Sequence, residues 1–120
     1  MAKKILVVDD AMFMRKLLSD ILSKAGYEVV AEAGNGEEAY QMFKQHHPDL
    51  VTMDITMPEV TGIEGVKLIT LDYPDAKILM CSAMGQENMV IDSVKAGAKG
   101  FIVKPFVAEK VIAEVQKLIG

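Results

Sequence analysis

Four apolar stretches of the chain end in side chains that could take part in chemistry. Asp9 and Asp10 follow KILVV, Asp54 follows LVTM, Ser82 follows ILMC, and Lys104 follows FIV. Apolar runs of this kind are typical of strands that are covered on both faces, and a carboxylate at the end of such a strand needs a cation to offset its lost solvation. In a parallel sheet the carboxyl ends of all strands lie at one edge, where ligands bind. The pattern therefore predicts one polar site built from distant parts of the chain.

The three carboxylates of this site would repel one another strongly. At an effective dielectric near 20, each pair of like charges at about 4 Å costs on the order of 4 kcal/mol, which one lysine cannot fully offset. A divalent cation could do so, and oxygen ligands without His or Cys favour Mg²⁺. The Lys104 ammonium and the Ser82 hydroxyl would then suit the oxygens of a phosphoryl group, while Asp54 could attack phosphorus. The product is a mixed anhydride that hydrolyses readily, as a timed switch requires.

Strand and helix patterns alternate five times along the chain. Strands are expected at residues 5–8, 27–31, 50–53, 77–81 and 101–103. Apolar residues at helical spacing follow each of them, and Val90, Ile91 and Val94 mark the fourth helix. Asn35 with Glu38, and Thr61 with Glu64, resemble capping boxes at the starts of the second and third helices.

These alternations, joined by short connections, predict an α/β fold with a parallel sheet and helices on both faces. A loop containing Met57, Pro58 and Gly62 should follow Asp54. Met84 and Met89 should flank the fourth helix on a partly exposed side.

Length and composition set limits on the function. The chain has 120 residues, 51% hydrophobic and 25% charged, so we expect a single globular domain over residues 1–120. The net charge of −4 and the scattered lysines argue against nucleic acid as a partner. The sequence has neither a signal-peptide core nor an apolar run of 18 residues, so we expect no membrane partner and a cytoplasmic location. The single Cys81 lies in an apolar run and should be a buried, reduced thiol.

Four separated motifs together resemble the receiver domain of response regulators, and the free-standing chemotaxis members of that family in particular. The motifs are VVDD, DITMPEVTG, the Ser82–Ala83 pair and the Lys104–Pro105 pair, and the resemblance extends from Lys4 to the C-terminus. It implies a flavodoxin-like (βα)5 fold whose five parallel strands have the order 2-1-3-4-5.

The resemblance also assigns roles to the residues of the predicted site. It implies that Asp54 is the phosphoacceptor and that Asp10, Asp54 and the backbone carbonyl of Thr56 bind Mg²⁺, with Asp9 acting through a water molecule. Ser82 would hydrogen-bond the phosphoryl group and shift toward it; many family members have Thr at this position.

Two further positions complete the implied site. Lys104 would pair with the phosphoryl group, and its bond to Pro105 would be cis. Phe101 occupies the aromatic switch position, where Tyr is common. The change on phosphorylation would reach a face made by the fourth helix, the fifth strand and the fifth helix.

The family resemblance implies the partners too. A histidine kinase of the chemotaxis type would supply the phosphoryl group, the flagellar motor switch would be the target, and a phosphatase would be a further partner. We expect a monomer that catalyses its own phosphorylation and dephosphorylation rather than an enzyme acting on free substrates. Because no effector domain follows Gly120 in the sequence, output is expected through protein contact.

Three alternatives remain open at this stage. A phosphorelay intermediate would use the same site but pass the phosphoryl group to another histidine, which reverse transfer would reveal. A flavodoxin-like electron carrier would need a loop rich in Ser, Thr and Gly after the first strand, where this chain has Asp9-Asp10-Ala11. A hydrolase acting on free substrates would need a pocket, and turnover of a small phosphate ester would expose it.

Overall fold

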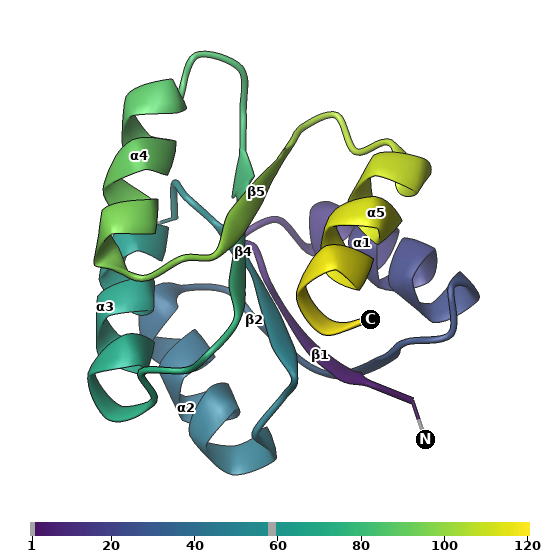
Figure 1. Cartoon of the computed structure of the whole chain (residues 1–120), viewed down its shortest axis with the longest axis horizontal. Coiled ribbons are helices and arrows are strands. Elements are labelled where there is room, and N and C mark those ends of the chain that lie inside the picture. The colour runs from purple at the N-terminus through teal and green to yellow at the C-terminus, as the bar shows by residue number, and fades with distance from the viewer. Residues whose placement is uncertain (1, 58–59) are drawn as a thin grey trace.

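Strands and helices alternate along the chain in the computed structural model, which describes residues 2–57 and 60–120 (Figure 1). Pro58 and Glu59, in the loop predicted after Asp54, lie outside the described residues. The elements are β1 (Lys4–Val8), α1 (Met12–Lys24), β2 (Glu28–Ala33), α2 (Gly36–His46), β3 (Leu50–Asp54), α3 (Gly62–Asp72), β4 (Ile78–Ser82), α4 (Glu87–Ala96), β5 (Gly100–Val103) and α5 (Ala108–Ile119). The strands form a parallel sheet in the order β2-β1-β3-β4-β5, which confirms the α/β class and the order 2-1-3-4-5.

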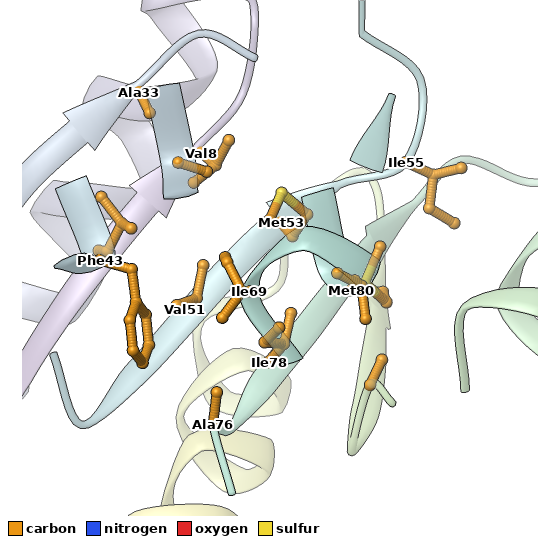
Figure 2. Close-up of a cluster of buried hydrophobic side chains, with 14 of the residues drawn as sticks. Val8, Ala33, Phe43, Val51, Met53, Ile55, Ile69, Ala76, Ile78 and Met80 are labelled. Atoms are coloured by element: carbon orange, nitrogen blue, oxygen red, sulfur yellow. The ribbon is translucent and has the colours of Figure 1, made fainter. Parts of the chain in front are cut away.

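Helices cover both faces of the sheet and divide the core into two clusters. On one face, α2 and α3 contribute Phe43 and Ile69, which pack against the sheet (Figure 2). Val90 of α4 belongs to the same cluster. On the other face, α1 and α5 contribute Leu22 and Val115. Every residue of β3 and β4 is buried. This two-sided burial explains why the central strands appear in the sequence as continuous apolar runs.

The edge strand β2 was predicted less accurately than the central strands. It begins at Glu28 and continues to Ala33, two residues beyond the expected end at Ala31. A shift in register between Ile5 and Leu6 of β1 lets the two strands stay paired up to Val8 and Ala33. Because one side of β2 has no neighbouring strand, its residues are mostly half-exposed, and its polar residues interrupt the apolar run that marks a buried strand.

Both predicted helix caps are present, one of them in altered form. Thr61 and Glu64 form the complete capping box at the start of α3. At α2, the Asn35 side chain accepts a hydrogen bond from the Glu38 N–H at 2.9 Å. The Glu38 carboxylate, however, accepts from the N–H of Gly34 at 2.8 Å rather than from Asn35, so the reciprocal bond is displaced by one residue.

The apolar residues that mark α4 in the sequence differ in burial. Val90 is buried, whereas Ile91 is 52% exposed and Val94 is 48% exposed. Met84 and Met89 are exposed as well, which confirms the expected partly exposed side. Among the described residues, no helix combines the length and the apolar character needed to cross a membrane.

Candidate functional site

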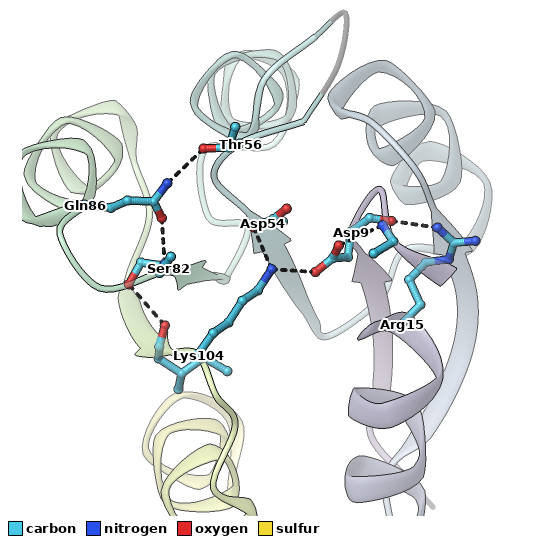
Figure 3. Close-up of polar contacts among 10 residues, drawn as sticks. Asp9, Arg15, Asp54, Thr56, Ser82, Gln86 and Lys104 are labelled. Atoms are coloured by element: carbon cyan, nitrogen blue, oxygen red, sulfur yellow. Dashed lines mark hydrogen bonds and ion pairs between the residues drawn. The ribbon is translucent and has the colours of Figure 1, made fainter. Parts of the chain in front are cut away.

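The carboxyl edge of the sheet brings together the polar groups that end its strands (Figure 3). Asp9 and Asp10 follow β1, and Asp54 is the last residue of β3. One carboxylate oxygen from each of these three residues lies within 4.8 Å of the other two. Ser82 ends β4, and Lys104 directly follows β5. The predicted convergence of these segments is therefore confirmed.

The start of α3 holds the backbone of Asp54 in place. The N–H of Gly62 donates to the carbonyl of Ile55 at 2.9 Å. A Cβ atom on Gly62 would lie 2.0 Å from the carbonyl oxygen of Asp54, so a larger residue cannot occupy this position without moving the strand end. The glycine of the DITMPEVTG motif thus packs the helix directly against the candidate acceptor.

Lys104 contacts two of the three carboxylates. Its Nζ atom lies 3.0 Å from Asp9 Oδ2 and 3.2 Å from Asp54 Oδ1. Burial alone would lower the pKa of Lys104, but its hydrogen bond to Asp9 and the charges of Asp54 and Asp9 outweigh that effect and raise the pKa. The ammonium is therefore charged at neutral pH. The predicted cis bond between Lys104 and Pro105 is present.

The Asp54 carboxylate is incompletely compensated by its surroundings. Its side chain is 8% exposed. Burial, followed by the charge of Asp9, raises its pKa to about 6, and the charge and hydrogen bond of Lys104 offset only part of that rise. Asp10 raises the pKa further. A site that already holds two other carboxylates thus disfavours the ionised form of Asp54 until a further cation is added.

Asp9 is fixed by contacts of its own, some of which involve a residue not predicted from the sequence. Its carboxylate accepts a hydrogen bond from the Ala11 N–H at 2.9 Å. The Nη1 of Arg15 donates to the Asp9 carbonyl at 2.7 Å, and the Nε of Arg15 pairs with Glu32 at 2.9 Å. Arg15 lies in the first turns of α1 with no distinguishing pattern around it, so only the folded arrangement reveals its role.

The polar group that ends β4 is bonded to β5 rather than to Asp54. The buried Ser82 hydroxyl donates to the carbonyl of Ile102 at 3.4 Å. Phe101 is 46% exposed. Gln86, also not predicted, connects the N–H of Ala83 to the hydroxyl of Thr56. A polar residue in the loop before a helix is common, so the sequence gives no signal for this bridge.

The acidic cluster has the donor chemistry of a magnesium site. Its donors are carboxylate oxygens from Asp9, Asp10 and Asp54, close enough together to share one ion. Hard oxygen ligands of this kind suit Mg²⁺, which is usually held by one or two carboxylates together with water. The residues present are thus compatible with Mg²⁺.

Comparison with known proteins agrees with this geometry. Residues 5–116 match the family described as the response regulator receiver domain. The chain is 58% identical to the chemotaxis protein CheY of Bacillus subtilis over 120 residues, covering 100% of both chains. It is 57% identical to the chemotaxis protein CheY of Thermotoga maritima over 118 residues, covering 98% of each.

Solved structures give the same result. The response regulator domain of Thermotoga maritima CheB has a TM-score of 0.91 at 34% identity, covering 98% of this chain and 96% of that one. The CheX-CheY-BeF3-Mg²⁺ complex from Borrelia burgdorferi has a TM-score of 0.93 at 38% identity, covering 98% of this chain and 90% of the matched chain. With these matches and the acid–lysine site at the carboxyl edge of its sheet, the chain belongs to the response regulator receiver family, the phosphorylation-activated switches of two-component signalling.

Proposed function

We propose that this chain is a chemotaxis-type response regulator that accepts a phosphoryl group on Asp54. The observation that supports this most strongly is the position of the Asp54 carboxylate. It lies at the carboxyl edge of the sheet, 3.2 Å from the Lys104 ammonium and beside Asp9 and Asp10. Lys104 can place positive charge near the oxygens of an incoming phosphoryl group, and positioning and charge provide most of the catalysis in phosphoryl transfer.

The proposed reaction uses a phosphohistidine on a histidine kinase as the donor. A carboxylate oxygen of Asp54 attacks phosphorus, the P–N bond breaks, and its electron pair remains on the imidazole nitrogen. Lys104 pairs with the phosphoryl oxygens, and the Ser82 hydroxyl turns from the carbonyl of Ile102 to donate to them. Later attack by water breaks the P–O bond to Asp54, which restores the carboxylate and releases phosphate.

Mg²⁺ is the proposed cofactor of both steps. Asp10, Asp54 and the backbone carbonyl of Thr56 would hold the ion, and Asp9 would contact it through water. The ion would neutralise the carboxylates and the negative charge of the transferring group. The raised pKa of Asp54 supports this assignment, because it shows that the residues around Asp54 leave its charge undercompensated.

Output is proposed through the surface of α4, β5 and α5. The exposed apolar residues there include Ile91, Phe101, Val103 and Val107. Phe101 is proposed as the switch residue, because its half-exposed ring adjoins Ile102, whose carbonyl holds the Ser82 hydroxyl. The proposed target is the flagellar motor switch, reached by the monomer in the cytoplasm, with a histidine kinase and a phosphatase as further partners.

Exposure to acetyl phosphate tests the proposed reaction. The intact mass of the parent should increase by one phosphoryl group in the presence of Mg²⁺ and should not change when EDTA is present. The Asp54→Asn variant should gain no mass in either buffer. A phosphorylated Asp54→Asn protein, or a parent that stays unmodified with Mg²⁺ under conditions that preserve acyl phosphates, would contradict the proposal.

A further inference from the structure

The side chain of Gln86 bridges two loops at the edge of the site (Figure 3). Its Oε1 accepts a hydrogen bond from the backbone N–H of Ala83 at 2.6 Å. Its Nε2 donates to the hydroxyl of Thr56 at 2.9 Å. Ala83 directly follows β4, and Thr56 lies two residues beyond the end of β3. One carboxamide therefore ties the loop after β4 to the loop after Asp54.

The strand register explains why one side chain can reach both partners. Asp54 of β3 pairs with Cys81 of β4. Continuing this parallel register by two residues brings Thr56 level with Ala83, just beyond the hydrogen-bonded part of the sheet. Among the described residues of these two loops, no ladder pair follows Asp54 and Cys81, and the carboxamide of Gln86 supplies the connection instead.

In this form of the site, the protein itself provides acceptors for the donors at the carboxyl ends of β4 and β5. The Lys104 ammonium contacts Asp9 and Asp54. The Ser82 hydroxyl donates to a carbonyl of β5, and the N–H of Ala83 donates to Gln86. A phosphoryl group has several strong acceptor oxygens that need such donors. Recruiting the donors after β4 thus requires breaking bonds that the protein already makes.

We infer that Gln86 is a positioning residue whose carboxamide oxygen occupies the Ala83 N–H in the unphosphorylated protein and is displaced when Asp54 carries a phosphoryl group. The inference rests on the proposed function and adds a control element to it. Through Thr56, the same side chain holds the loop after β4 against the loop that carries the proposed Mg²⁺ ligand. The bridge thereby stabilises the unphosphorylated arrangement, and its removal favours the phosphorylated one.

The first test examines the bridge without any phosphoryl group. The Gln86→Met variant keeps the length of the side chain but removes both hydrogen bonds. Exchange of the Ala83 amide proton with water, measured by NMR in EDTA, should be at least about threefold faster in this variant than in the parent, because the exposed amide loses its acceptor. The matched control Gln45→Met, at an exposed position near the end of α2, should exchange like the parent. Equal exchange in Gln86→Met and the parent would overturn the inference.

The second test measures the consequence for the phosphorylated form. Beryllofluoride with Mg²⁺ serves as the probe, since it mimics a phosphoryl group on a carboxylate. Its half-saturating concentration should be about fivefold lower for Gln86→Met than for the parent, which corresponds to about 1 kcal/mol. Gln45→Met should match the parent. An unchanged or higher concentration for Gln86→Met would contradict the inference.

A double-mutant cycle separates the bridge from a general effect of changing Gln86. Thr56→Val keeps the backbone carbonyl and the shape of the side chain but removes the hydroxyl that accepts from Gln86. If the bridge acts as a unit, the two substitutions together should have a smaller effect than the sum of their separate effects. If the effects of the two substitutions were additive, the hydrogen bond between Gln86 and Thr56 would have no role in beryllofluoride binding, which would contradict the inference. A parent that fails to bind beryllofluoride at all would instead refute the proposed function, whatever the amide exchange shows.

Discussion

The two halves of the site are built differently. The acid half consists of Asp9, Asp10 and Asp54 at the ends of β1 and β3. The donor half consists of residues 82–86, which begin with the last residue of β4, together with Phe101. In the acid half, Asp9 and Asp54 are buried and linked by Lys104, and α3 packs on the strand end that carries Asp54. In the donor half, hydrogen bonds turn inward to the protein, and Met84 and Phe101 are exposed.

From this difference we expect the acid half to stay in place on phosphorylation while the donor half changes its hydrogen bonds. The negative charges of the three carboxylates in the acid half repel one another, and a bound cation would relieve this repulsion. The positions of these carboxylates depend on the packed centre of the sheet. The donor half lies at the same carboxyl edge, on β4 and β5, and borders the exposed face of α4 and β5. We therefore expect a change at Asp54 to alter the donor half without disturbing the core.

Removal of Lys104 should have the largest effect on the acid half. We expect Lys104→Met to lower the free energy of unfolding by about 3 kcal/mol at pH 8 in EDTA, because two buried carboxylates lose their shared cation. Urea denaturation measures this loss. The exposed Lys95→Met on α4 is the matched control and should change stability by less than about 0.5 kcal/mol. Equal stability of the two variants would show that Lys104 does not compensate the acid half.

The pH dependence of the free energy of unfolding should reveal the cost of ionising Asp54 in the folded protein. Its pKa of about 6 in the folded protein exceeds the ordinary value of 3.8, so the folded state binds the proton more tightly. The contribution of Asp54 to the free energy of unfolding is therefore fully present below pH 4 and is lost as the pH rises through about 6. The difference between the two pKa values corresponds to about 3 kcal/mol.

The Asp54→Asn variant tests directly whether the Asp54 carboxylate causes this pH dependence. In EDTA the variant should be more stable than the parent by about 2 kcal/mol at pH 7, because removal of the charge outweighs the lost contact with Lys104. The advantage should shrink toward zero near pH 4, where the parent carboxyl is protonated. A destabilised variant at pH 7 would mean that the Lys104 contact outweighs the repulsion in the acid half.

Mg²⁺ should have a moderate stabilising effect through the same half. At a concentration ten times its Kd, the ion should add about 1.4 kcal/mol and raise the melting temperature by several degrees. Asp10→Asn should greatly reduce this gain, whereas Asp92→Asn, at an exposed position on α4, should preserve it. An unchanged melting temperature of the parent in millimolar Mg²⁺ would contradict binding at the acid cluster.

The smallest change in the free energy of unfolding is expected for substitutions on the exposed face of α4, beside the donor half. Ile91→Ser should change the free energy of unfolding by less than about 0.5 kcal/mol, since that side chain is 52% exposed. The neighbouring Val90→Ala should cost about 1–2 kcal/mol, because Val90 is buried against the sheet. Urea denaturation of both variants checks the difference, and similar losses would place Ile91 in the core.

The fold class and the meeting of the site residues at one sheet edge could be predicted from the sequence for one physical reason. Buried parallel strands appear as apolar runs, and Asp54 ends such a run, so its place at the sheet edge could be predicted. The strand order came with the family resemblance rather than from periodicity. The extent of β2 was missed because an edge strand does not need a continuous apolar run.

The contacts of Arg15 and Gln86 were also beyond prediction. Each depends on where a loop lies relative to a neighbouring strand, which neither spacing nor composition specifies. The roles assigned to Asp10, Thr56 and Phe101 remain predictions, and the Asp10→Asn variant tests the first of them.

The most direct measurement of the central claim identifies the phosphorylated residue. After exposure to acetyl phosphate and Mg²⁺, borohydride reduction converts an aspartyl phosphate into homoserine, and peptide mass spectrometry locates the change. The predicted result is homoserine at position 54, with Asp9 and Asp10 unmodified. Homoserine at position 9 or 10, or at any other residue with Asp54 intact, would contradict the assignment of Asp54 as the acceptor.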